Sequence, residues 1–213
     1  MKKIIILVVL MVFAIQSNAQ IRYGSCKSKS QSRLYITPYI GAGGGLYSYD
    51  LNKTVVGPGP DSLVYDNSKG VLYTPVVGLN IMYSIGKANI GGGLEWQGAF
   101  GRTSTDVSSH NHSIYFYKFY GRFEYALYSD SFSDFGFNFQ GGLSFPNNTL
   151  GASNDMGMFL SAGLFYNLII NSTSSIIIGA DYEYSAFTST IGNSVSNHKY
   201  QPIKLTIGYR FWF

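Results

Sequence analysis

The chain has 213 residues, of which 12% are charged and 16% are aromatic, and it contains 18 Tyr, 15 Phe and 25 Gly. The charged share is about half that of an average soluble domain, which disfavours a water-solvated surface and favours a lipid-facing one. The net charge of +4 falls to +2 once Lys2 and Lys3 are removed with the leader described next, which excludes the electrostatic footprint of a nucleic-acid-binding protein.

The first 19 residues have the three parts of a secretory signal peptide. Lys2-Lys3 is the positive part, Ile4–Ile15 is apolar, and Ser17-Asn18-Ala19 is a small-residue cleavage site before Gln20. The apolar part is too short for a membrane helix, and no later stretch reaches the roughly 18 apolar residues that such a helix needs. Any crossing of a membrane is therefore expected to use strands.

Residues 20–33 are polar and basic, and we expect a disordered periplasmic segment that leads into the folded domain. Contact of this segment with anionic lipid headgroups is an alternative. Cys26 is the single cysteine, so an internal disulfide is impossible. We expect a free thiol. The alternative, a lipidated first residue, is disfavoured because Tyr23 stands where a small aliphatic residue is preferred.

Beyond Arg33 the chain repeats runs of about 10–15 residues in which apolar residues alternate with small or polar ones. Each run is long enough for a tilted strand of about 9–11 residues to cross a hydrocarbon layer, and an even number of strands is typical of bacterial barrels. The eight expected strands are Leu34–Tyr49, Val71–Ser84, Ala88–Gly101, Ile114–Tyr128, Asp134–Phe145, Met156–Leu168, Ser175–Thr188 and Lys199–Phe213.

The connections between these runs alternate in length. Three are short: Ile85–Lys87, Ser129–Ser133 and Ile169–Ser174. Four are longer and polar: Asp50–Gly70 (with turn residues at Gly57–Asp61), Arg102–Ser113, Pro146–Asp155 and Ser189–His198. Short periplasmic turns and long external loops are typical of outer-membrane barrels, and an even strand number is expected to leave both termini on the periplasmic side.

One face of each run is apolar and is expected to contact lipid. In the fourth, fifth and seventh runs these faces are Tyr115, Tyr117, Phe119, Phe123, Tyr125 and Leu127; Phe135, Phe137, Phe139, Gly141, Leu143 and Phe145; and Ile176, Ile178, Ala180, Tyr182 and Tyr184. Tyrosines near the ends of the runs are expected to reach the headgroups.

The opposite faces carry four acids and four bases: Glu95, Lys118, Arg122, Glu124, Asp181, Glu183, Lys204 and Arg210. A base that faced lipid at mid-membrane would cost about 2–4 kcal/mol, so these faces are expected to line the lumen. The equal numbers of acids and bases favour an ion-pair network that fills the barrel over the lining of a narrow pore. The same faces hold small residues, as a narrow interior requires: Gly91, Gly93, Gly136, Gly142, Gly163, Gly179 and Gly208.

Two features weigh on this interpretation. A secreted β-sandwich also alternates, but its water-facing side would carry Thr, Lys and Glu rather than glycines with balanced charges. Pro38, Pro75 and Pro202 lie inside runs, where each removes a ladder hydrogen bond; they are expected near the barrel rims, where bulges are common.

The last run places Leu205, Ile207, Tyr209, Phe211 and Phe213 on one apolar face and ends on an aromatic residue. This pattern resembles the closing strand of bacterial outer-membrane β-barrels, which the barrel-assembly machinery recognises. Together with the inner charges, it is similar to small eight-stranded barrels of the OmpA and OmpX type, without the peptidoglycan-binding domain of the OmpA plan. The resemblance implies an all-β, eight-stranded, antiparallel, up-and-down transmembrane barrel over residues 34–213 in the outer membrane, with membrane lipids and the assembly machinery as partners.

The expected function is that of a non-enzymatic barrel with a filled lumen, whose external loops bind an unknown ligand or partner. We expect no cofactor and no metal. A narrow porin or small hydrophobic-solute channel is the first alternative.

A lipid A-modifying enzyme is the second alternative. It rests on the loop Ser108–Ser113, which holds His110 and His112 near Asp106, because lipid A deacylases and palmitoyltransferases use similar barrels with Ser and His near the outer rim. The two histidines, with His198, would also allow a metal site, although no ligand spacing here is diagnostic.

Overall fold

The computed structural model describes residues 33–55, 62–104, 109–148, 153–191 and 194–213. The strands are β1 (Arg33–Val55), β2 (Ser62–Ile85), β3 (Ala88–Ser104), β4 (Ser109–Ser129), β5 (Ser133–Asn148), β6 (Ser153–Asn154), β7 (Gly157–Asn171), β8 (Ser174–Ile191) and β9 (Ser194–Trp212). No helix that could cross a membrane occurs in these residues. The signal peptide, residues 20–32 with Cys26, and the Gly57–Asp61 turn lie outside the described residues.

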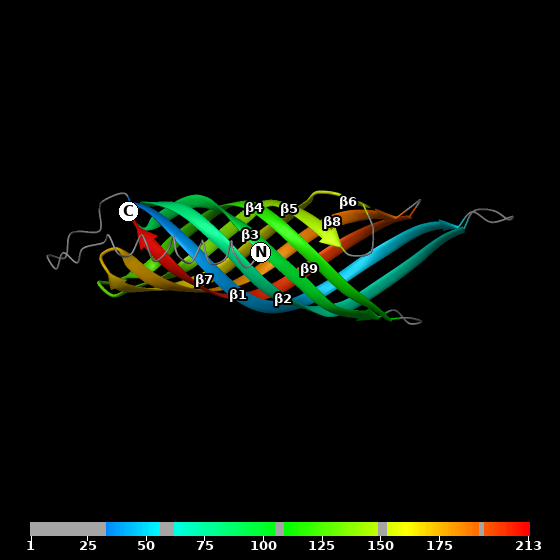
Figure 1. Ribbon diagram of the computed structural model, residues 1–213, viewed down its shortest axis with the longest axis horizontal. Helices are drawn as coiled ribbons and strands as arrows, with labels where there is room; N and C mark the ends of the chain where they lie inside the picture. Colours follow the sequence, from blue (N-terminus) through cyan, green and yellow to red (C-terminus); the bar gives the residue numbers. More distant parts are fainter. Residues whose placement is uncertain (1–32, 56–61, 105–108, 149–152, 192–193) are drawn as a thin grey trace, which may run out of the picture.

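The strands form one closed antiparallel ring. Apart from the short β6, each strand pairs with the strand before and the strand after it, and β9 pairs with both β8 and β1, which leaves no free edge along the barrel wall. β6 pairs with β8 beyond the end of β7, so β6 and β7 are two parts of one barrel strand. The ring therefore has eight strands, and the predicted up-and-down barrel is confirmed (Figure 1).

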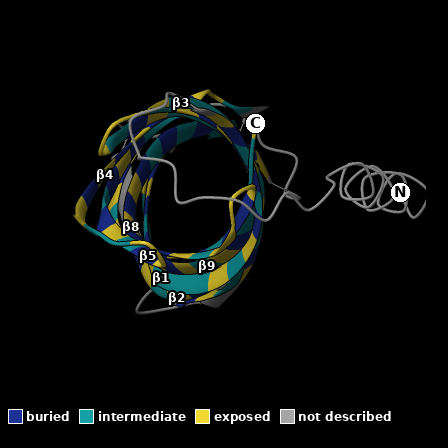
Figure 2. Cartoon of the chain, turned by 90° about the vertical axis from the view of Figure 1, so that its left-hand side faces the viewer, coloured by how far each residue is buried: buried dark blue, intermediate teal, exposed yellow. Residues whose placement is uncertain are grey.

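The two faces of the wall differ because successive side chains of a strand point to opposite sides. Viewed along the barrel, buried residues line the inside of the ring and exposed residues its outside (Figure 2). β7 shows the alternation most simply: from Gly157 to Leu160, side chains are in turn buried, exposed, buried and exposed.

The strands continue beyond the ends expected from hydropathy. The described residues of the four expected loops are mostly strand: these loops are Asp50–Gly70, Arg102–Ser113, Pro146–Asp155 and Ser189–His198. β1 and β2 stay paired out to Val55 and Ser62. The β1–β2 hairpin projects farthest from the ring (Figure 1). The apolar face of each strand ends where a membrane would end. Backbone hydrogen bonding between strands does not depend on apolar side chains, so the strands stay paired beyond that point.

The short connections at the opposite end are tight turns. Ile85 pairs with Ala88 around Gly86, whose φ of 65° suits glycine. In the β4–β5 turn the Asp130 carboxylate accepts the backbone N–H groups of Phe132 at 2.7 Å and Ser133 at 2.6 Å, and these bonds lower the pKa of Asp130. These turns fix which strands pair and in which register.

The three prolines interrupt ladders without shifting them. The β1–β9 pairing has a gap at Pro38, the β2–β3 pairing at Pro75 and the β8–β9 pairing at Pro202, and the register is the same on both sides of each gap. The two register shifts in the described strands lie elsewhere, next to the short turns, at Ala126/Tyr128 and at Ile169/Asn171. Each proline thus removes a ladder bond on one side only.

Candidate functional site

The lumen is the candidate site, and the structure places all eight ionisable residues named above on its inner face. Their exposed fractions range from 0% for Glu183 to 8% for Arg122. β4 carries three of them at inward positions, in the order Lys118, Arg122, Glu124, running from the long-hairpin end towards the short turns. The lumen is therefore built in layers along the barrel axis.

The middle layer is an ion-pair box made of Glu95, Lys118, Glu183 and Lys204, from β3, β4, β8 and β9. Lys204 Nζ lies 2.9 Å from Glu95 Oε1 and 2.7 Å from Glu183 Oε2. Lys118 Nζ lies 3.3 Å from Glu95 Oε1 and also pairs with Glu183. Each lysine thus bridges both acids, and the box joins strands from opposite parts of the ring.

Neutral side chains complete the hydrogen bonding of the box. Tyr39 donates to Glu95 Oε2 at 2.8 Å, Ser185 donates to Glu183 Oε1 at 2.7 Å, and Gln97 accepts from Lys118. A buried charge without partners would be strongly destabilising, whereas a network whose members are bonded is tolerated.

The layer nearest the short turns is centred on Glu124. This carboxylate accepts from Arg122 Nε at 2.9 Å, Arg210 Nη2 at 2.9 Å, Tyr35 Oη at 2.9 Å and Asn89 Nδ2 at 3.1 Å. The Arg210 guanidinium also lies 4.0 Å from the centroid of the Tyr35 ring, a cation–π contact. One acid therefore serves two arginines.

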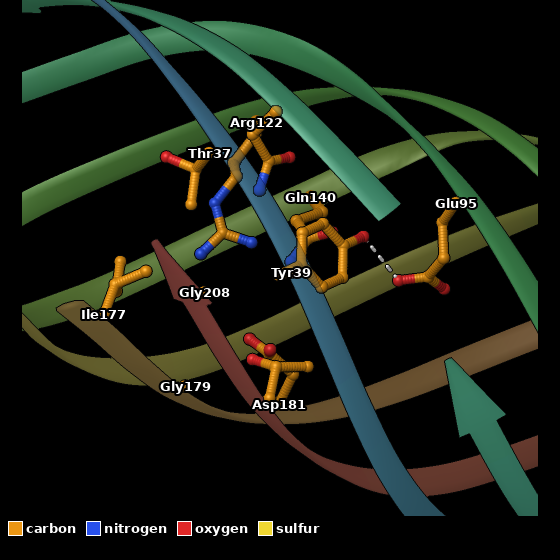
Figure 3. Close-up of a pocket in the computed structure, with 11 residues that line it drawn as sticks. Thr37, Tyr39, Glu95, Arg122, Gln140, Ile177, Gly179, Asp181 and Gly208 are labelled. Carbon is orange, nitrogen blue, oxygen red and sulfur yellow. Dashed lines mark hydrogen bonds between the residues drawn. The ribbon is translucent and has the colours of Figure 1, made fainter. Parts of the chain in front are cut away.

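Asp181 is buried on the inner face but makes no ion pair with a described residue, and its Oδ1 has no hydrogen-bond partner there. Its side chain lines a small pocket that Arg122 and Gln140 also line (Figure 3). The pocket offers about 20 Å³ to the centres of water-sized molecules, room for one or two waters. The box has two Lys and two Glu and is neutral, while Glu124 with two Arg leaves one positive charge. Asp181 supplies the balancing negative charge across this pocket.

The layer at the long-hairpin end of the lumen is an aromatic and aliphatic neck. Phe116 meets Phe187 edge-on at 5.5 Å between ring centroids and stacks on Tyr200 at 6.1 Å. The residues that form the neck are Tyr47, Leu72, Ala99, Ile114, Phe116, Phe187 and Tyr200. Tyr47 and Tyr200 lie within β1 and β9 and point inward.

Two histidines cap the neck. The His198 ring stacks on Phe187 at 4.5 Å, its Nδ1 lies 2.6 Å from Tyr47 Oη, and its Nε2 lies 2.6 Å from Ser189 Oγ. His112 Nε2 lies 2.8 Å from Thr103 Oγ1. His112 was expected in a loop, yet it is an inward residue of β4.

His198 lies beyond the apolar belt, because its outward neighbours Asn197 and Lys199 are polar. Burial, and secondarily His112, lower the pKa of His198 to about 4. The side chain of His110 lies outside the described residues. No group of three His, Cys, Asp or Glu side chains suited to a metal occurs in the part of the chain that the structure describes.

The outer face of the ring is a continuous apolar belt. Ile40, Leu160, Ile203 and Leu205, from three of the strands, are each 61–68% exposed. The last strand contributes its whole apolar face: Leu205 is 62%, Ile207 49% and Phe213 59% exposed, and Tyr209 and Phe211 are half-buried beside them. A water-soluble monomer rarely shows so many large apolar side chains in one band.

Comparisons with solved structures show the same fold. Neisserial surface protein A (NspA) superposes with a TM-score of 0.52 at 13% identity, over 84% of this chain and 97% of that one. The outer membrane protein OprG from Pseudomonas aeruginosa gives 0.53 at 12% identity, over 88% and 99%. No family model matches the chain, and no curated protein matches it in sequence. The chain therefore has the fold of small eight-stranded outer-membrane β-barrels, and these likenesses show the fold alone.

Proposed function

We propose that this protein is an integral outer-membrane barrel without enzymatic activity, whose lumen is closed by its own side chains and whose external hairpins make surface contacts. The observation that supports the proposal is the stack of three layers in the lumen: the neck, the box and the Glu124 cluster. Side chains from opposite walls meet in the neck and in the box. An eight-stranded barrel is just wide enough to be filled in this way.

The cellular setting belongs to the same proposal. Residues 1–19 direct export and are cleaved before Gln20, residues 20–33 remain in the periplasm, and residues 34–213 form the barrel. The assembly machinery recognises the face from Leu205 to Phe213, and lipids cover the apolar belt. The support for this setting is the exposed belt together with the leader-like start of the sequence.

Planar-bilayer recording tests the filled lumen. The folded mature chain is expected to give no stable conductance steps, with a large porin in the same bilayers as the positive control. Stable steps from the wild-type chain would contradict the proposal and favour the narrow-channel alternative.

The external hairpins are the proposed contact surface because β1 and β2, of 23 and 24 residues, are the longest strands described. Replacing residues 51–69 by a two-residue turn should abolish attachment to surfaces or partners while leaving the barrel folded. Unchanged attachment by a folded, shortened protein would remove this part of the proposal.

A lipid-modifying enzyme is the second candidate, favoured by the chain of hydrogen bonds from Ser189 through His198 to Tyr47. A serine held by a histidine is the core of a nucleophilic site, although a tyrosine stands here where a carboxylate is usual. Ser189 is 3% exposed and faces the lumen, so an acyl chain would have to enter from the external end. If deletion of the gene alters lipid A acylation and Ser189→Ala fails to restore it, the enzyme is correct and the non-enzymatic proposal is wrong.

A further inference from the structure

Three exposed cations lie on the outside of the barrel, beyond the apolar belt at the long-hairpin end. They are Lys69 on β2, Arg102 on β3 and Lys199 on β9, and these strands are neighbours in the ring with β1 between β9 and β2. We call these three residues the basic arc. None of them makes an ion pair with a described residue.

The register places the members of the arc close together. Ser48 of β1 pairs with Lys69 on one side and with Lys199 on the other, so the two lysines flank a single small residue. Lys69 pairs with Ser104, which makes Arg102 its diagonal neighbour on β3. Diagonal side chains on one face lie about 7–8 Å apart at their Cα atoms, so a single tetrahedral anion can reach both Lys69 and Arg102.

The depth of the arc follows from the last apolar outward residue on each strand. Lys69 stands two residues beyond Val71, and Arg102 two residues beyond Phe100. Two residues of a strand tilted by about 40° rise about 5 Å along the membrane normal. The headgroup layer extends about 5–7 Å beyond the hydrocarbon on each side, so both cations lie at headgroup depth.

An aromatic cluster marks the same boundary. Phe100 meets Tyr115 edge-on at 5.5 Å, Trp96 stacks on Tyr115 at 5.9 Å, and Tyr73 is 57% exposed beside them. Aromatic side chains of this kind gather where hydrocarbon meets headgroups. Their position just below Arg102 is independent support for the depth of the arc.

Charge around the rim is asymmetric. On β1 and the three strands of the arc, the one described acidic side chain outside the barrel is Asp50, which lies one outward position farther from the belt than Ser48. On the other half of the rim, the described outward residues beyond the belt include Asn111, Asn147, Asp155 and Thr188, and none is a cation. The positive charge is therefore confined to one side of the barrel.

We propose that the basic arc binds phosphate groups of anionic lipids in the leaflet that surrounds the long-hairpin end of the barrel. Arg102 can offer two parallel N–H groups to a phosphate and Lys69 a compact charge beside it. Lys199, farther from the belt, would contact a larger headgroup with its long side chain. The inference rests on the proposed membrane location, because lipid must lie against the belt for the arc to meet its headgroups.

Native mass spectrometry of the folded mature chain in neutral detergent, titrated with lipid A and separately with phosphatidylcholine, tests the arc. We expect preferential retention of lipid A, a loss of about fivefold in affinity for Lys69→Gln or Arg102→Gln, and about 25-fold for both together. Lys87→Gln, which removes an exposed lysine in the β2–β3 turn at the opposite end, is the matched control and should change nothing.

Equal retention of the two lipids, or equal binding by the wild type and the double variant, would overturn the inference. Displacement of lipid A by inorganic phosphate, but not by chloride at the same ionic strength, would reassign the arc to free phosphate and also overturn it. A chain that folds in vesicles but shows no lipid preference refutes the arc alone. A chain that does not enter vesicles at all refutes the proposed membrane function.

Discussion

At the scale of single residues, seven of the eight charges on the inner face make ion pairs with described residues, and Asp181 is the exception. Glu124 of β4 accepts hydrogen bonds from four residues. Arg122 is on the same strand, and the other three are Tyr35 on β1, Asn89 on β3 and Arg210 on β9. The box distributes its bonds in the same way, since both lysines contact both acids. Removing one partner therefore disturbs several strands at once.

Lys204→Met tests the box directly. The change leaves Glu95 and Glu183 with Lys118 as their one shared base and gives the box a net negative charge. We expect the free energy of unfolding to fall by about 3–5 kcal/mol in denaturant titrations in phospholipid vesicles. The double variant Lys204→Met with Glu183→Gln is the control, because it restores one acid against one base and should regain part of the loss. An unchanged midpoint for Lys204→Met would show that the box does not form.

His198 predicts a dependence of stability on pH. Its pKa is lowered in the folded state to about 4 from 6.5, because burial penalises the charged ring and His112 lies nearby. The unfolded state therefore binds the proton more tightly. Above about pH 6.5 His198 is neutral in both states and the free energy of unfolding is unaffected. As the pH falls from 6.5 towards 4, the free energy of unfolding decreases by up to about 3 kcal/mol.

The side chains around His198 offer no compensating carboxylate among the described residues: they are Tyr47, Tyr49, His112, Phe187 and Ser189. The amide of His198→Gln can still bond Tyr47 or Ser189 but does not titrate. The difference in unfolding free energy between wild type and this variant should shrink from pH 7 to pH 4. A constant difference over that range would mean that His198 does not remain neutral in the fold.

At the scale of strands, inner glycines allow neighbouring strands to approach each other closely. Gly142 on β5 pairs with Tyr120 on β4, and a Cβ at Gly142 would overlap the backbone oxygen of Phe119. Gly142→Ala should therefore destabilise the barrel by about 1–3 kcal/mol. Gly121→Ala is the matched control on the outer face, where the nearest atom would be 3.9 Å away. Equal unfolding midpoints for the two variants would show that the close approach of β4 and β5 does not require glycine at position 142.

The sequence predicts the two faces of each strand well. Side chains alternate with a period of two, so once the apolar face is identified, the residues of the inner face are known. The eight inner charges, the inner glycines and the number of barrel strands all follow from that period. The pairing across the lumen does not follow. Lys118 meets Glu95 on the adjacent strand but also Glu183 from another part of the ring, and such a contact depends on strand tilt and closure.

The period of two also places Phe116, Phe187 and Tyr200 inward, because each shares the phase of the inner charges on its strand. Their meeting in one neck does not follow from the sequence, because it depends on register and closure across the ring. The long hairpins could not be predicted either, because they continue as paired strands through polar residues, where hydropathy gives no strand signal.

At the scale of the whole molecule, the apolar belt, the ionic inner face and the closed ring are consistent with one another only in a membrane. The outer face is apolar where the inner face is ionic, which reverses the arrangement of a soluble protein. Because of this inversion, a charged substitution on the belt should affect the free energy of unfolding differently in water and in lipid. A lysine placed on the belt would be neutral or favourable in water and costly in lipid.

Ile207→Lys tests the inversion, because Ile207 is 49% exposed and lies between Leu205 and Tyr209 on the outward face of β9. In phospholipid vesicles we expect a loss of about 2–4 kcal/mol in unfolding free energy, since a lysine near the bilayer midplane must be desolvated. Asn197→Lys, on the same face beyond the belt, is the control and should cost about 0–1 kcal/mol. If Ile207→Lys is as stable as Asn197→Lys, the belt does not face hydrocarbon.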